Sequence, residues 1–289
     1  MGPTASGKTE LAEQLADRYD AQLINADAFQ VYRGFDIGTA KTENKSRYLL
    51  MDIRGPSEAF GVGEFVVLAA DAIGKLWEKG RSAIVVGGTG LYIRALFEQY
   101  ANMAGLPDPA LRAELDERIL IQGLPALYAE LRAVDPAAAE AVDPQNPARV
   151  RRALERALAT EVPIHFDLPP YPKMKIVLEW PKEQLITRIE NRFDEMMQNG
   201  WIEEVRRLKA GGVSFDSAGM RAIGYRTLWR HLEGELSLTE AKESIVAEMR
   251  QYAKRQKTWL RAEPRAVRLE CEHGTQLRMA MDQIAEWGG

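Results

Sequence analysis

Apolar and polar positions over the first hundred residues alternate between two periodicities, which predicts strands and helices in turn. Short apolar runs at 21–27, 48–53 and 82–88 have the length and composition of buried strands. Between them, residues 8–19 and 64–79 carry apolar side chains at helical spacing. Strands that alternate with helices predict a parallel sheet whose ligand site lies at the carboxyl ends of the strands.

The pattern changes in the second hundred residues. Residues 101–160 show no strand pattern, are rich in alanine and are punctuated by X-Pro steps, which predicts several short helices. KIVLEW at 175–180 predicts a strand that returns to the first sheet, and the chain beyond it is helical in pattern almost to its end. We therefore expect the α/β class, with a parallel-sheet core at 1–100 and 174–289, a helical C-terminal region within it, and a helical insertion domain at 101–173.

Eight residues near the start of the chain, GPTASGKT (2–9), match a phosphate-binding loop that runs into a helix and would make the core a P-loop core. Its two glycines let backbone N–H groups surround an anion, Lys8 adds a full positive charge, and Thr9 offers a hydroxyl to Mg²⁺. The pattern leaves open whether the anion belongs to a nucleoside triphosphate or to another diphosphate. Because such a loop normally follows a buried strand, we expect a short apolar segment ahead of Met1, lost by truncation or by a start assigned too late.

Composition narrows the class of protein. A chain of 289 residues can hold a full core and two domains. The net charge of −4 gives no global sign of a polyanionic partner, so a nucleic-acid site would have to be a local basic patch. The single cysteine, Cys271, excludes an internal disulfide framework and a cysteine-built metal site. No apolar run approaches the span of about 20 residues that a membrane requires, and no signal peptide is visible, so we expect a cytoplasmic protein with no membrane partner.

Three further places in the sheet region could carry chemistry. Asp27 follows the first predicted strand, where a carboxylate can bind Mg²⁺ or act as a general base, although a turn aspartate bonded to its own backbone fits equally well. The polar segment at 34–41 suits a second ligand or forms an ordinary surface loop. GGTGLY at 87–92 could present backbone N–H groups to a phosphate or a base, and a tight turn explains its glycines equally well.

Basic residues recur on three predicted helices. Arg149, Arg152 and Arg156 share one helical face that suits nucleic-acid phosphates, although a solvated face is the commoner interpretation. Arg188 and Arg192, one turn apart, could clamp a diphosphate or pair with surface acids. A third helix, beginning with a Ser-x-x-Glu capping box and predicted to run from Leu238 to Arg261, carries a basic stripe beside its core face. That core face comprises Ile245, Met249, Tyr252, Gln256 and Trp259.

Six motifs in the same order resemble those of the tRNA dimethylallyltransferase family, also called tRNA isopentenyltransferase. The resemblance covers nearly the whole chain and implies transfer of a dimethylallyl group from dimethylallyl diphosphate to the exocyclic N6 amine of the adenosine immediately 3′ of the tRNA anticodon. The motifs are GPTASGKT (2–9), DIGTAK (36–41), GGTGLY (87–92), the Asn146–Pro147 helix start, RAIGYR (221–226) and AKRQKTW (253–259).

The resemblance implies roles for residues that match these motifs. Lys8, the helix N-terminus and Mg²⁺ held by Thr9 would stabilise the leaving diphosphate, and Asp27 would accept the proton of the amine. The target adenine must leave its stack, and the helical insertion would clamp the anticodon stem of a monomeric enzyme. The diphosphate-binding residues implied are Gly2, Thr4, Ala5, Ser6, Gly7, Lys8, Thr9 and Arg192. The tRNA-binding residues implied are Asp27, Ala28, Phe29, Gln30, Thr89, Arg112, Ala148, Arg149, Val150, Arg151, Arg152, Arg221, Ala222, Ile223, Gly224, Tyr225 and Arg226.

Two other functions are compatible with a phosphate-binding loop. A small-molecule kinase would need an acid at the end of a strand for its metal, and Asp52 could serve. An RNA-binding protein gated by ATP would use the loop for a nucleotide and the basic helices for RNA. The chain also departs from the family at Ala28, where many members have serine, and the sequence leaves open whether ATP binds in addition to the prenyl donor.

Overall fold

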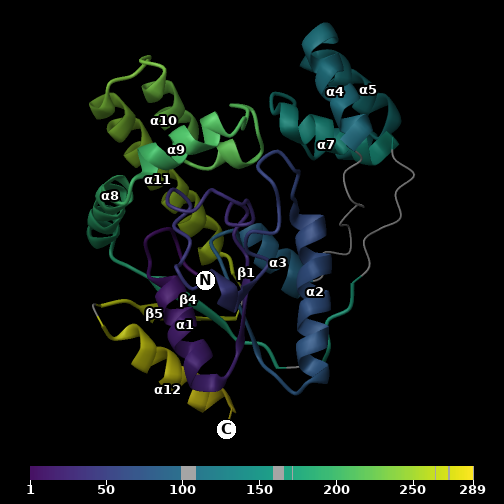
Figure 1. Cartoon of the computed structure of the whole chain (residues 1–289). Coiled ribbons are helices and arrows are strands. Elements are labelled where there is room, and N and C mark those ends of the chain that lie inside the picture. The colour runs from purple at the N-terminus through teal and green to yellow at the C-terminus, as the bar shows by residue number, and fades with distance from the viewer. Residues whose placement is uncertain (99–108, 159–165, 171, 264, 273, 289) are drawn as a thin grey trace. The chain divides into compact units, whose positions relative to one another are not determined.

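The computed structural model describes residues 1–98, 109–158, 166–170, 172–263, 265–272 and 274–288 (Figure 1). The chain divides into two compact units, the larger formed by Met1–Gln99 with Asp167–Gly289 and the smaller by Tyr100–Phe166. The insertion predicted from the sequence spans 101–173, so the smaller unit of the structure ends earlier in the chain than predicted. In the described parts, no helix is long and apolar enough to cross a membrane.

Three short parallel strands form the first sheet of the larger unit. Strands β1 (Gln22–Asn25), β2 (Tyr48–Leu49) and β3 (Ala83–Val86) pair in the order β2-β1-β3. The parallel α/β core expected from the alternating pattern is thereby confirmed. Strand β2 is shorter than the apolar run at 48–53, because Leu50 and Asp52 have left-handed backbone angles (φ 61° and 54°) that take the chain out of the extended conformation.

A second, separate sheet corrects two sequence-based expectations. Strand β4 (Lys175–Glu179) does not return to the first sheet but pairs in parallel with β5 (Ala266–Glu270). Strand β5 lies in the region interpreted as helical; only Leu269 of its five residues is buried, so its apolar pattern is weak. The other side of β4 is bonded to Met1, which donates its amino group to the Ile176 carbonyl at 2.6 Å and accepts from the Leu178 N–H at 3.0 Å.

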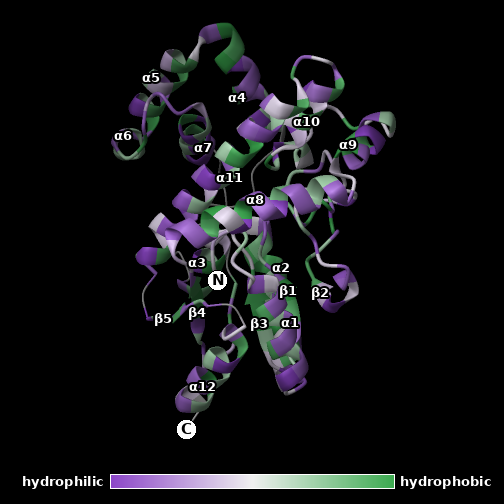
Figure 2. Cartoon of the chain, turned by 90° about the vertical axis from the view of Figure 1, so that its left-hand side faces the viewer, coloured by the Kyte–Doolittle hydropathy of each residue, from purple (hydrophilic) through white to green (hydrophobic). Residues whose placement is uncertain are grey.

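Helices cover the strands of the larger unit. Helix α1 (Lys8–Tyr19) packs against β1 and β3, and Figure 2 shows these hydrophobic strands beside it. Helix α11 (Leu238–Arg261) begins with the expected capping box at Ser237 and packs against α3, α8 and α10. The remaining elements are α2 (Val62–Glu78), α3 (Gly90–Glu98), α8 (Lys182–Gln198), α9 (Trp201–Ala210), α10 (Tyr225–Leu232), α12 (Gln276–Gly288) and the 3₁₀ turns η1 (Lys45–Arg47) and η2 (Gly219–Arg221).

A buried carboxylate organises the core where α9, α10 and the segment after β1 meet. The Glu204 side chain accepts backbone N–H groups of Asp36 at 2.9 Å and Ile37 at 2.8 Å, and the Tyr225 hydroxyl at 2.6 Å. Burial and the nearby Glu204 charge raise the pKa of Tyr225 well above its ordinary value, so the hydroxyl stays protonated and donates. Trp201 packs edge-on against the Tyr225 ring, which is fully buried.

The smaller unit is a helical bundle with its own apolar core. Its helices are α4 (Pro109–Gln122), α5 (Leu124–Val134), α6 (Pro136–Glu140) and α7 (Pro147–Leu158). The Asp135 side chain caps α6 by accepting the Ala138 N–H. The side chains buried most completely in this core are Leu115, Leu127, Leu131, Val150 and Leu154.

Tyr225→Phe should lower the free energy of unfolding by about 1–2 kcal/mol, because it removes one buried hydrogen bond to a carboxylate without adding an atom. Urea denaturation followed by circular dichroism measures the change. Tyr19→Phe is the matched control, since the Tyr19 side chain is 41% exposed. A Tyr225→Phe protein as stable as the wild type would show that the hydroxyl makes no net contribution to the core.

Candidate active site

Residues 2–9 form a tight loop that ends at the first turn of α1. Gly7, the residue before the helix, has φ 83°, and Ala5 also lies in the left-handed region with φ 60°. These angles turn the chain sharply, and the first N–H groups of α1 have no acceptor within the helix. The loop and helix end therefore have the geometry of an anion-binding site, as the motif predicts.

Three side chains from distant parts of the sequence hold this loop. The Gln256 Oε1 atom accepts the Thr4 N–H at 2.7 Å, Arg188 Nε donates to the Ala5 carbonyl at 2.7 Å, and Trp180 Nε1 donates to the Ser6 carbonyl at 2.9 Å. The Arg188 guanidinium also stacks 4.2 Å from the centre of the Trp180 ring. The sequence pattern places Gln256 only on a core face and gives no role to Trp180. A polar residue on a mostly apolar helix face is the signal that points to Gln256.

Lys8 and Arg192 concentrate positive charge beside the loop. Lys8 Nζ donates to the Pro3 carbonyl at 3.4 Å. Burial, followed by repulsion from Arg192, lowers the pKa of Lys8 to about 8, and the negative charge of Asp27 partly offsets this. Burial lowers the pKa of Arg192 as well, and Asp27 again opposes the shift. The structure thus brings together three residues that the sequence assigned to the site separately.

Asp27 has one oxygen engaged in a turn, and its other oxygen lies near Gly88. Its Oδ1 accepts the Phe29 N–H at 3.0 Å, which is the self-bonded turn that the sequence also allows. A Cβ atom built on Gly88 would lie 3.7 Å from Asp27 Oδ2 and 3.7 Å from Lys8 Cε, so Gly88 borders the space between these two groups. The carboxylate can therefore hold its turn and still present an oxygen to a reactant.

The segment GGTGLY forms a tight turn packed on β1 and α11. A Cβ atom on Gly87 would collide with the Ala26 carbonyl, and one on Gly90 would collide with the Trp259 ring. Thr89 Oγ1 accepts the Ala28 N–H at 3.0 Å, which ties this turn to the residue after Asp27. The glycines thus serve close packing, and Thr89 lies beside the candidate base.

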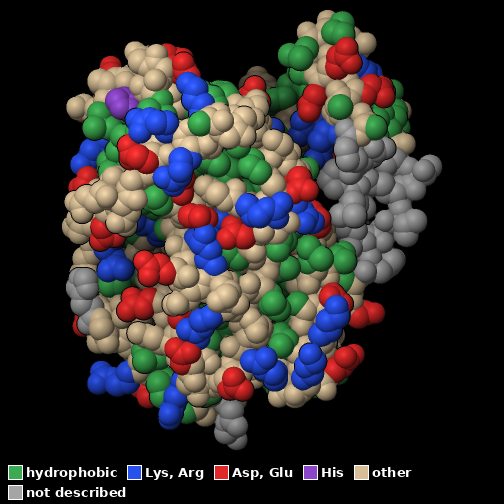
Figure 3. Space-filling view, viewed as in Figure 1, with side chains coloured by type: hydrophobic (Ala, Val, Ile, Leu, Met, Phe, Trp, Pro, Cys, Tyr) green, Lys and Arg blue, Asp and Glu red, His purple; other side chains and the backbone are tan. Residues whose placement is uncertain are grey.

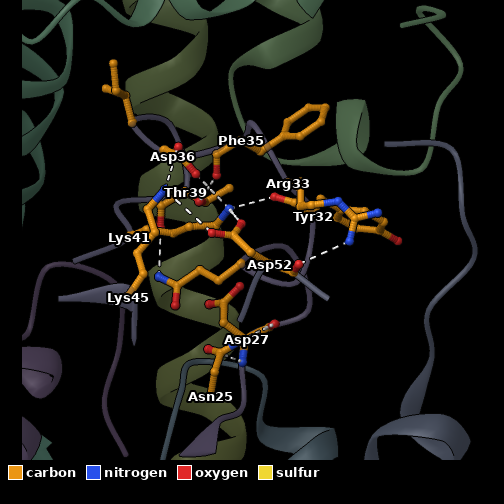
Figure 4. A network of polar contacts seen from close by, with 12 residues as sticks. Asn25, Asp27, Tyr32, Arg33, Phe35, Asp36, Thr39, Lys41, Lys45 and Asp52 are labelled. Atoms are coloured by element: carbon orange, nitrogen blue, oxygen red, sulfur yellow. Dashed lines mark hydrogen bonds and ion pairs between the residues drawn. The ribbon is translucent and has the colours of Figure 1, made fainter. Parts of the chain in front are cut away.

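The segment at 34–41 is a loop held by the buried charge of Lys41 (Figure 4). The Lys41 side chain is fully buried, donates to the Tyr32 carbonyl at 2.6 Å and pairs with Asp36 at 2.8 Å and with Asp52. Burial alone would raise the pKa of Asp36, but bonds from Lys41 and Lys45 hold it below its ordinary value. Because Asp52 is also paired with Lys45, the acid that a kinase would need here is already neutralised.

The predicted tRNA residues at 221–226 divide into surface and core. Arg221 is exposed, and Arg226 pairs with Asp216 at 3.2 Å. The side chains of Ala222 and Tyr225 are buried in the core, and Gly224 has φ 87° beside the Trp201 ring; the tRNA-binding role assigned to these three positions stays a prediction. The RAIGYR motif (221–226) therefore contributes side chains both to the core and to the surface. Of the other residues in that set, Gln30 donates to the Thr39 carbonyl and Phe29 and Ile223 pack partly buried against the core.

The predicted tRNA residues of the smaller unit also divide. Val150 is fully buried in the helical core, whereas Ala148 and Arg149 are exposed, and the tRNA-binding role of all three stays a prediction. Arg112 and Arg152 converge on the buried Glu155 carboxylate at 3.0 and 3.1 Å, and Arg151 pairs with Asp116. Basic and acidic side chains are interspersed in the space-filling view, as expected of a slightly acidic chain (Figure 3).

Comparison with known proteins gives one consistent result. Residues 30–263 match the sequence model of the family described as IPP transferase. The chain is 43% identical over 275 residues to a tRNA dimethylallyltransferase of Syntrophobacter fumaroxidans, which covers 91% of this chain and 80% of that protein.

Solved structures agree with the sequence comparison. The tRNA isopentenylpyrophosphate transferase of Bacillus halodurans matches with a TM-score of 0.71 and 36% identity, covering 99% of this chain and 94% of that one. The tRNA isopentenylpyrophosphate transferase of Staphylococcus epidermidis matches with a TM-score of 0.70 and 30% identity, covering 99% and 97%.

Trp180→Phe should weaken binding of inorganic diphosphate about three- to tenfold, because it removes the donor to the Ser6 carbonyl and leaves the aromatic surface that stacks on Arg188. Isothermal titration calorimetry measures the dissociation constant. Trp287→Phe, at an exposed site near the C-terminus, is the control. Equal affinities in the wild type and Trp180→Phe would mean that the loop holds its shape without this bond.

Proposed function

Because the chain belongs to the IPP transferase family, we propose that it transfers a dimethylallyl group from dimethylallyl diphosphate to the N6 amine of the adenosine immediately 3′ of the anticodon in tRNA. Prenyl transfer to tRNA rests on the family match and the named relatives. The single observation that supports the chemistry is the meeting of a phosphate-type loop, two cations and one carboxylate at the same place.

The leaving group determines what the loop has to do. As the bond between the allyl carbon and the diphosphate oxygen breaks, negative charge grows on the diphosphate. Lys8, Arg192 and the N–H groups at the start of α1 are in place before the reaction begins. They would therefore stabilise that charge as it develops without reorganisation of the site. The loop can hold the diphosphate of the prenyl donor, and transfer from that donor needs no ATP.

Thr9 is the residue that would hold Mg²⁺. Its hydroxyl lies half-buried at the start of α1 and makes no hydrogen bond with any residue that the structure describes. The described residues contain no cluster of three or more acidic, histidine or cysteine side chains that could hold a metal. This fits Mg²⁺, which commonly binds through few protein groups together with phosphate oxygens and water. When bound, the ion would neutralise charge on the diphosphate.

Asp27 is the proposed general base. The exocyclic amine attacks the allyl carbon, the carbon–nitrogen bond forms, and the carbon–oxygen bond to diphosphate breaks. The nitrogen must lose a proton as this happens because an alkylated amine otherwise carries a positive charge. Asp27 Oδ2 is the oxygen left for that proton, since Oδ1 accepts the Phe29 N–H. The Thr89 hydroxyl, bonded to the Ala28 N–H, lies ready to orient the adenine.

The anticodon stem-loop is the proposed RNA partner. Arg149 and Arg221 are exposed and can contact phosphates, whereas Arg112 and Arg152 are partly committed to Glu155. The helical unit would clamp the stem while the adenine turns out of its stack. A monomer suffices for this arrangement, and a tRNA substrate implies a cytoplasmic reaction.

The kinase alternative is disfavoured because Asp52 is paired with Lys41 and Lys45. An RNA-binding protein gated by ATP would instead hydrolyse ATP when RNA is added.

The test combines transfer with one substitution. Purified protein, Mg²⁺, radiolabelled dimethylallyl diphosphate and an anticodon stem-loop with adenosine 3′ of the anticodon should give labelled RNA. Asp27→Asn should reduce transfer at least about 100-fold, the scale of a general base, with unchanged affinity for the stem-loop. Asp71→Asn, at an exposed pair with Lys75, is the control. If the wild-type protein gives no labelled RNA, the proposed function is contradicted. If Asp27→Asn labels RNA as fast as the wild type, Asp27 is not the general base.

The reaction should also depend on the charge of Lys8. Its pKa of about 8 lies below the ordinary value of 10.5, so the free enzyme loses this positive charge as the pH rises through about 8. We expect kcat/KM for the donor to be constant below that pH and to fall up to about tenfold per unit above it. Steady-state rates between pH 6.5 and 9.5 measure this. Lys8→Arg should be slower overall but lack this decline, and a flat wild-type profile would argue against the assignment.

A further inference from the structure

Gln256 is a buried amide in the middle of α11 with both polar atoms bonded. Its side chain is 1% exposed; Oε1 accepts the Thr4 N–H at 2.7 Å and Nε2 donates to the Gly88 carbonyl at 2.9 Å. An N–H on one side requires an acceptor and a carbonyl on the other requires a donor, so only one orientation of the amide satisfies both. Burying an amide is costly without such bonds, which makes both of them necessary.

The two groups that Gln256 joins belong to opposite halves of the site. Thr4 lies in the loop that leads to Lys8 and the diphosphate. Gly88 precedes Thr89, which bonds the residue after Asp27. A Cβ atom on Gly88 would lie 2.5 Å from Gln256 Nε2 and 3.7 Å from Asp27 Oδ2, so the amide lies directly behind the space between donor and base.

Helix α11 is suited to fix a distance. It runs for 24 residues from a complete capping box. Met249, Ala253 and Leu260 are buried on either side of Gln256, and Trp259 packs against Gly90. The amide is therefore carried by a long helix with little freedom to shift, and the two loops are attached to it.

We propose that Gln256 is a positioning residue for the transfer, which sets the spacing between the diphosphate loop and the Gly88–Thr89 turn beside Asp27. It acts through Thr4 and Gly88 and touches neither reactant. The inference rests on the proposed function, because a displacement requires diphosphate, allyl carbon and amine in line. A misplacement of about 1 Å in such a reaction costs on the order of 100-fold in rate.

The first variant, Gln256→Met, keeps the length of the side chain and removes both hydrogen bonds. Arg188 and Trp180 still hold the loop at Ala5 and Ser6, so donor binding should change less than the rate. We expect kcat per diphosphate-binding site to fall about 10- to 100-fold, with the dissociation constants for diphosphate and stem-loop within about threefold of wild type. Binding sites are counted by equilibrium dialysis below the melting temperature of each protein, so unfolded chains do not enter the rate.

The second variant, Gln256→Glu, adds a readout that a purely structural role does not move. When protonated, the new carboxyl can donate to the Gly88 carbonyl and accept the Thr4 N–H; when ionised, it repels that carbonyl. The ratio of its kcat per site to that of wild type should therefore rise as the pH falls from 8 to 6. Gln251→Met, at an exposed position of the same helix, is the control and should match wild type.

The outcomes separate the possibilities. A reduced kcat for Gln256→Met with preserved binding, or a ratio for Gln256→Glu that rises toward low pH, supports the inference. A kcat for Gln256→Met within about threefold of wild type, or a loss confined to donor affinity, overturns it. If Gln256→Met yields no folded protein, a Gln256→Glu ratio that is flat with pH overturns it. Absence of transfer by the wild-type chain would contradict the proposed function itself.

Discussion

The hydrogen bonds that hold the phosphate loop from outside are the constraint on which the rest of the site depends. When the N–H groups of a loop face an anion, its carbonyl groups point away from the anion and need hydrogen-bond donors from elsewhere in the protein. Arg188 and Trp180 supply them at Ala5 and Ser6, and Gln256 secures the loop one residue earlier. Because these side chains come from segments far along the chain, the loop in the folded protein is held by contacts from the C-terminal half.

The electrostatic character of the site follows from that fixed loop. Burial, followed by repulsion from the nearby Arg192, lowers the pKa of Lys8, so its positive charge is unfavourable in the free protein. A bound diphosphate would relieve this repulsion, so the site is built for an anion that it must acquire. Asp27 opposes the shift in the pKa of both Lys8 and Arg192, and it keeps one oxygen free of its own turn.

Local signals allowed the sequence to predict much of this fold, and long-range pairing limited the rest. Helix α1, strand β1 and the glycine turns follow from periodicity and backbone requirements within a few residues. The pairing of β4 with β5 joins segments about 90 residues apart, and only one side chain of β5 is buried, so no local pattern reveals it. The same limit applies to Gln256, whose role depends on two loops that its own neighbours in sequence do not specify.

Two groups of backbone N–H donors in this protein differ in the source of their anion. Asp36 and Ile37 direct their N–H groups at Glu204, a carboxylate that the chain itself provides and that Tyr225 also binds. That arrangement is complete in the folded protein and stabilises the core. The loop at 2–9 has a similar capacity, but no carboxylate of the described residues is bonded to its N–H groups. The N–H groups of the loop at 2–9 are therefore open to an anionic ligand, whereas those of Asp36 and Ile37 are already bonded to Glu204. This difference separates the candidate binding loop from the structural one.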